Sequence, residues 1–97
     1  MSYIFLPDAQ EELERAIANY YILDQRLGDR FDKTLESMID TIVANPTLWR
    51  ERRGGYRRVN CHRFPYYFAF IIRGQTIVIV AFAHSHRKPE YWKNRLG

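Results

Sequence analysis

Apolar side chains in the first half of the chain recur at steps of three and four residues, the period of an α-helix with one buried face. The first series consists of Leu13, Ala16, Ile17, Tyr20 and Tyr21. The second series consists of Leu27, Phe31, Leu35, Met38, Ile39, Ile42 and Val43. The pattern therefore predicts two helices, and the short break between them at residues 23–28 makes them antiparallel neighbours.

Local signals mark the ends of these helices. Asp8 is expected to cap the first helix, because Glu11 three residues later completes a capping box. The second helix should stop at Asn45-Pro46, since a proline disfavours helical geometry in the residue before it. The side of the first helix opposite its apolar face carries charged residues, namely Glu12, Glu14 and Arg15. Residues 2–6, which precede the Pro7-Asp8 break, are expected to form a strand.

After Pro46 the apolar residues become aromatic or β-branched, which is typical of strands. Strands are expected at residues 56–60, 64–72 and 76–83, with a tight hairpin turn at Arg73-Gly74-Gln75. Residues 50–55 are expected to be a loop and residues 88–96 a polar tail. The order β-α-α-β-β-β predicts a single α+β domain over residues 1–97, in which an antiparallel two-helix hairpin packs on a small antiparallel sheet.

Both faces of the expected sheet are apolar. In residues 64–72 one face carries Phe64, Tyr66, Phe68, Phe70 and Ile72, and the other carries Tyr67, Ala69 and Ile71. A sheet with one solvated face would alternate apolar with polar residues, so both faces are expected to be covered. The helices cover one face. The C-terminal tail, a second copy of the chain or another protein could cover the other.

Charge is divided between the two halves of the chain. Residues 1–49 hold nine acidic and four basic side chains, whereas residues 50–97 hold eleven basic and two acidic ones, which together give the net charge of +4. A basic surface of this kind attracts polyanions or an acidic protein segment. Cys61 is the one cysteine, so no internal disulfide forms. No apolar run has the length of a membrane span, and the expected location is a reducing cytoplasm with no membrane partner.

Several short motifs appear in a characteristic order: Tyr56-Arg57-Arg58-Val59, then Arg63-Phe64-Pro65-Tyr66, then His84-x-x-Arg87-x-Pro89-x-Tyr91-Trp92. Together with Asn45-Pro46 they resemble the RelE/ParE superfamily of bacterial toxins from type II toxin–antitoxin pairs, and the resemblance covers nearly the whole chain. It implies growth inhibition, a cognate antitoxin as partner, operator DNA bound only through that antitoxin, and no cofactor.

The superfamily divides by target. RelE-like members cut mRNA on the ribosome without metal, and ParE-like members poison DNA gyrase. The RelE-type set of basic residues is at best half present here: Arg57 stands for a lysine, Val59 replaces a second lysine, and an aromatic, Tyr66 or Tyr67, replaces an arginine. The resemblance therefore favours a ParE-like gyrase poison. A ribosome-dependent endoribonuclease and a degenerate, non-toxic binding module are the alternatives.

The resemblance also suggests candidate site residues. If the chain is a nuclease, the catalytic candidates are His84, His86, Arg87 and Tyr91. The candidates for contacts with the target or the antitoxin are Arg57, Arg58, Arg63, Tyr66, Arg87, Tyr91 and Trp92. His84 and His86 lack an obvious third ligand, so no metal site is expected. Cys61 and His62 would point to opposite faces of a strand, and Cys61 is therefore expected to be a structural thiol.

Overall fold

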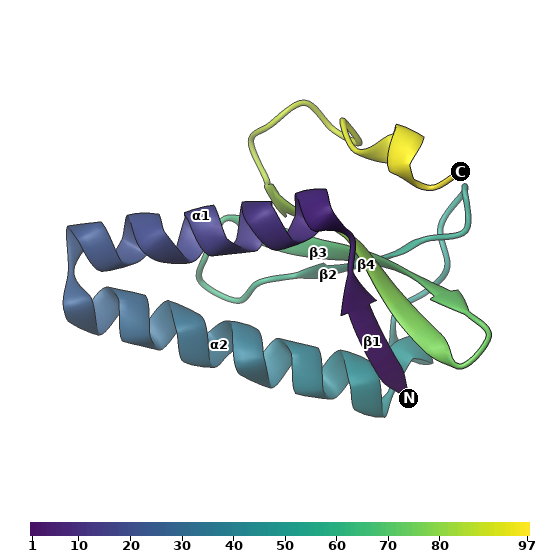
Figure 1. Cartoon of the computed structure of the whole chain (residues 1–97), viewed down its shortest axis with the longest axis horizontal. Coiled ribbons are helices and arrows are strands. Elements are labelled where there is room, and N and C mark those ends of the chain that lie inside the picture. The colour runs from purple at the N-terminus through teal and green to yellow at the C-terminus, as the bar shows by residue number, and fades with distance from the viewer.

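The computed structural model describes all 97 residues and has two helices on one side of a four-stranded sheet (Figure 1). The elements in chain order are β1 (Ser2–Phe5), α1 (Pro7–Leu23), α2 (Gln25–Ala44), the short 3-10 helix η1 (Pro46–Leu48), β2 (Arg57–Asn60), β3 (Tyr66–Arg73), β4 (Thr76–His84) and a second 3-10 helix η2 (Lys93–Arg95). The predicted α+β class and the order β-α-α-β-β-β are confirmed.

A single residue, Asp24, joins the two helices. Its carboxylate accepts hydrogen bonds from the backbone N–H groups of Arg26 at 2.7 Å and Leu27 at 3.2 Å, so Asp24 caps the start of α2. The predicted cap at Asp8 is wrong. Helix α1 begins at Pro7, whose fixed φ suits the first helical position, and Asp8 lies within the first turn.

The strands lie in the order β1-β4-β3-β2. Strands β2, β3 and β4 pair antiparallel as expected, but β1 runs parallel to β4, which makes the sheet mixed. The helix hairpin separates β1 from the other strands in the sequence, and such a long connection allows a parallel pairing. The expected turn is confirmed, because Gly74 has a φ of 61° between β3 and β4.

One layer of the core lies between the helices and the sheet. Phe31 and Leu35 of α2 pack there against residues of β3 and β4 such as Phe68 and Phe82. The opposite face of the sheet is covered by the C-terminal segment, residues 85–97. It is the yellow end of the chain in Figure 1 and lies on the side away from α2. Trp92 is 1% exposed there and donates a hydrogen bond through Nε1 to the Tyr67 hydroxyl at 2.9 Å. The C-terminal tail, one of the three covers considered, therefore packs on this face.

An irregularity in β4 interrupts the alternation of its side chains. Ala81 pairs with Ala69 and Ile79 pairs with Phe70, so Val80 is an extra residue on β4. Val80 and Ala81 consequently both face the C-terminal segment, and Phe82 faces the helices again.

Neither helix combines the length and the apolar composition that crossing a membrane requires.

Candidate functional site

Residues 80–84 of β4 pair with β3 on one side and have no neighbouring strand on the other, so they form a sheet edge. Strand β1 pairs with residues 76–79 only, and Leu6 makes the last backbone hydrogen bond, to the carbonyl of Ile79 at 2.9 Å. Beyond that point two side chains bind the free backbone groups. The N–H of Phe82 donates to Oε1 of Glu12 at 3.1 Å, and Nη1 of Arg95 donates to the carbonyl of Val80 at 3.0 Å. Side chains therefore replace the missing strand.

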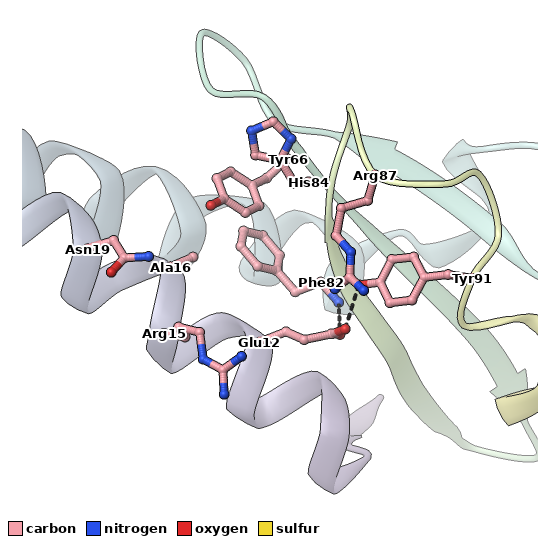
Figure 2. Close-up of a pocket in the computed structure, with 9 residues that line it drawn as sticks. All are labelled: Glu12, Arg15, Ala16, Asn19, Tyr66, Phe82, His84, Arg87 and Tyr91. Carbon is pink, nitrogen blue, oxygen red and sulfur yellow. Dashed lines mark hydrogen bonds between the residues drawn. The ribbon is translucent and has the colours of Figure 1, made fainter.

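Glu12 is the centre of this cluster. Arg95 binds its two oxygens, Nη1 to Oε1 at 3.0 Å and Nη2 to Oε2 at 3.1 Å. The Tyr91 hydroxyl also donates to Oε2, as Figure 2 shows. The Glu12 side chain is only 16% exposed. Its burial alone would raise the pKa of Glu12, but the hydrogen bonds from Arg95, Tyr91 and Phe82 outweigh burial and lower it. Glu12 lies on the side of α1 away from its apolar face, as the periodicity indicates, and the C-terminal segment packs against it there.

Tyr91 is held as a neutral hydrogen-bond donor. Burial is the main cause that raises the pKa of its hydroxyl, and the bond to the Glu12 carboxylate raises it further. The guanidinium of Arg87 lies 3.9 Å from the centroid of the Tyr91 ring, in cation–π geometry. Tyr91 therefore contacts the Glu12 carboxylate through its hydroxyl and the exposed Arg87 guanidinium through its ring.

A pocket of about 120 Å³ opens beside this cluster (Figure 2). The residues that line it come from α1, from the two long strands and from the C-terminal segment: Glu12, Arg15, Ala16, Asn19, Tyr66, Phe82, His84, Arg87 and Tyr91. The Tyr66 ring stacks on Phe82 at 4.9 Å, and the edge contact between His84 and Tyr66 is 5.0 Å. The structure thus brings together four of the residues suggested by the sequence: Tyr66, His84, Arg87 and Tyr91.

His86 lies next to this pocket without lining it. Its ring centroid is 5.1 Å from that of His84, and its backbone N–H donates to Nδ1 of His84 at 3.0 Å. No third histidine, cysteine or carboxylate joins the two rings to form a group that could hold a metal ion. The bond to the His86 backbone occupies one of the two nitrogens of His84.

The remaining candidates lie elsewhere. Arg57 donates to the carbonyl of Trp49 at 2.7 Å, and Arg58 stacks 3.7 Å above the Tyr67 ring, so these neighbours point to opposite faces of the sheet. Arg63 is exposed and has a left-handed φ of 73°. It lines a second opening, of about 510 Å³, against the basic side of α2. Trp92 belongs to the core of the tail-covered face.

Cys61 is buried in the core beneath the helices. Burial raises the pKa of its thiol to about 12, which keeps it protonated at neutral pH. His62 is exposed and lines the opening next to α2. This arrangement agrees with a structural thiol and offers no thiolate nucleophile.

The sequence matches the family model of the ParE toxin of type II toxin–antitoxin systems, parDE, over residues 3–89. The chain belongs to the ParE toxin family. The ParE match confirms the resemblance to the RelE/ParE superfamily and its ParE-like branch. Members of this family are toxins of type II toxin–antitoxin systems, which implies a cognate antitoxin for this chain.

A solved structure has the same ParE architecture. The chain from the chromosomal ParDE TA system of P. aeruginosa is 20% identical, with a TM-score of 0.72 over 87% of this chain and 95% of that one. At this identity the likeness supports the fold. No curated protein sequence matches the chain. The stretch matched by the ParE family ends before Tyr91 and Arg95, so those partners of Glu12 lie outside it.

Proposed function

We propose that this toxin poisons DNA gyrase by binding it, without cleavage chemistry of its own, and that a cognate antitoxin neutralises it. The resemblance to ParE-like toxins motivates the target, and the hydrogen bond from the Tyr91 hydroxyl to the buried carboxylate of Glu12 supports the absence of cleavage chemistry. In this account the chain acts in the bacterial cytoplasm, where gyrase works, and the antitoxin alone reads the operator DNA.

Metal-free RNA cleavage needs a base for the 2′-hydroxyl and an acid for the leaving oxygen. Tyr91 is a poor base, because burial and Glu12 raise the pKa of its hydroxyl and hold the proton inward. Glu12 is also unsuited, since each of its two oxygens already accepts two hydrogen bonds, from Arg95, Phe82 or Tyr91. Tyr91 and Glu12 thus support the fold and the binding surface rather than proton transfer.

The surface around the pocket suits binding to acidic groups. Arg87 and Lys88 are exposed at the end of β4, and Arg87 is held in place by the Tyr91 ring. Holding the side chain in this way reduces the entropy lost when a partner binds. Arg87 and Tyr66, which line the pocket, are therefore our proposed contacts for the target. The exposed Arg63, which lines the opening beside α2, is a proposed contact for the antitoxin.

The test is a gyrase supercoiling and cleavage assay with the purified chain. We expect loss of supercoiling and trapped double-strand breaks, both reversed by adding the antitoxin. An unaffected gyrase together with mRNA cut on ribosomes would instead indicate the RelE-like nuclease. Unimpaired growth on expression of the chain alone would indicate a degenerate binding module.

A further inference from the structure

A second basic surface lies between the loop before β2 and η2. It is a groove of about 390 Å³, which we call the arginine groove, and its lining residues are Arg50, Arg52, Arg53, Tyr56, Glu90 and Lys93. Four of these six side chains are cations and one is an anion. The groove shares no lining residue with the pocket around Glu12.

The backbone that carries two of the arginines is fixed. The N–H of Arg52 donates to the carbonyl of Tyr56 at 2.7 Å, and the N–H of Gly55 donates back to the carbonyl of Arg52 at 2.9 Å. Gly54 and Gly55 close this turn with φ values of 99° and 84°, which glycine adopts without strain. The ring of Tyr56 packs at 4.8 Å against Trp92, so the turn is anchored to the core.

The charge of the arginines is not compensated within the chain. The four ion pairs of the structure include none of Arg50, Arg52 and Arg53. Glu90, the acid in the groove, pairs with Lys93 at 3.5 Å. Arg52 and Arg53 on the fixed turn, and Arg50 just before it, therefore have no ion-pair partner, and Arg50 and Arg53 are exposed.

We infer that the arginine groove binds the sugar–phosphate backbone of double-stranded DNA. Guanidinium groups match phosphate oxygens in a two-point geometry, and contacts of this kind need cations rather than apolar surface. The one apolar lining residue, Tyr56, is only 5% exposed, which leaves little for the side chains of a peptide to pack against. The opening beside α2 differs, since Met38 and Phe64 contribute to its lining.

This contact is separate from gyrase poisoning and from operator reading by the antitoxin. Backbone contacts position a protein on DNA without reading sequence. A toxin that approaches an enzyme working on DNA would gain affinity from such contacts wherever duplex is exposed. The DNA-binding measurement contains no gyrase, so an absence of DNA binding would not contradict gyrase as the target. In the same way, an unaffected gyrase would not contradict binding of DNA in the arginine groove.

The experiment titrates the antitoxin-free chain against a fluorescent duplex of about 20 base pairs of arbitrary sequence, by anisotropy, between about 50 and 200 mM salt. The groove variant carries Arg50→Ala, Arg52→Ala and Arg53→Ala. The control removes the same charge from α2, through Arg26→Ala, Arg30→Ala and Lys33→Ala. A milder variant, Arg50→Ala with Arg53→Ala, keeps the half-buried Arg52 in case the triple change disturbs the fold.

We expect the groove variant to lose at least about tenfold in affinity at roughly 100 mM salt, and its log–log salt slope to flatten by about 2 to 3. The control should keep most of both. Equal losses in the two variants would mean that net charge alone attracts DNA and would overturn the inference. Binding of a poly-glutamate peptide as tight as that of the duplex, with the same dependence on the arginines, would assign the groove to an acidic protein and would also overturn it.

Discussion

Glu12 in α1 and Arg95 near the C-terminus form a two-point ion pair, with N–O distances of 3.0 and 3.1 Å, across the end of β4. Each partner also binds a backbone group of that strand, at Phe82 and at Val80. Their side chains are 16% and 17% exposed, so water screens the pair only weakly. The pair therefore holds α1, the sheet edge and the C-terminal segment together.

Replacing Glu12 by alanine is expected to lower the free energy of unfolding by about 2 to 3 kcal/mol, because Arg95 and the N–H of Phe82 would lose their partner in a half-buried site. Urea denaturation measures the change. Glu14→Ala is the matched control: Glu14 is exposed and accepts one hydrogen bond, from Gln10, so its change should stay within about 0.5 kcal/mol. Equal stability of the two variants would show that the cluster contributes nothing.

The same carboxylate makes stability depend on pH. The pKa of Glu12 is lower in the folded chain than its ordinary value of 4.5, so folding favours the ionised form. The contribution is complete above the ordinary pKa and is lost as the pH falls through the lower folded value. The difference in unfolding free energy between wild type and Glu12→Gln should therefore shrink from about pH 7 to about pH 3. A constant difference over that range would contradict the assignment.

The helices, the three antiparallel strands and their buried faces could be predicted, since each leaves a local period in the sequence. Phe31 and Phe68 follow those periods and lie in the core. The pairing of Glu12 with Arg95 could not, because the two are 83 positions apart and polar spacing says nothing about a distant partner. Glu12 lies opposite the apolar stripe of its helix, and that position predicts solvent unless the path of the tail is known.

Two other features of the fold also escaped prediction. A strand as short as β1 carries no local signal for its direction, which follows from where the helix hairpin returns the chain. The extra residue Val80 lies within an unbroken apolar run, so its sequence shows no break in the alternation. For the candidate site, the sequence motif singled out His84, Arg87 and Tyr91, which line one pocket, but it did not indicate Glu12, which binds Tyr91.

Trp92 tests whether the C-terminal segment holds the second face of the sheet. Trp92→Ala should lower the free energy of unfolding by about 3 to 5 kcal/mol, because it leaves a large cavity beside Tyr56 and Tyr67. Trp92→Phe keeps most of the ring and should cost much less, mainly the hydrogen bond to Tyr67, about 1 kcal/mol. Thermal or urea unfolding distinguishes the two. An unchanged free energy of unfolding in Trp92→Ala would mean that the stability of the sheet does not depend on the C-terminal segment.

Gly28 allows the close approach of the two helices. A Cβ at this position would lie 2.5 Å from Cγ of Tyr21, whose hydroxyl is held by Asp29 at 2.8 Å. Gly28→Ala is therefore expected to destabilise the chain by about 1 to 2 kcal/mol, although alanine is the better helix former. In a Tyr21→Ala background the clash is gone, and the same change should stabilise by up to about 1 kcal/mol. The same sign in both backgrounds would rule out the clash.

The role of Tyr91 separates binding from catalysis. Tyr91→Phe removes the hydroxyl that donates to Glu12 and leaves the ring beneath Arg87, so stability should fall by about 1 to 2 kcal/mol. Growth inhibition should fall only as far as the amount of folded toxin falls. A general acid or base would lose about 10² to 10⁴ in rate. Tyr3→Phe, at a tyrosine of β1 that is 45% exposed, is the matched control. Abolished toxicity in a Tyr91→Phe chain that remains folded would show that the hydroxyl takes part in chemistry.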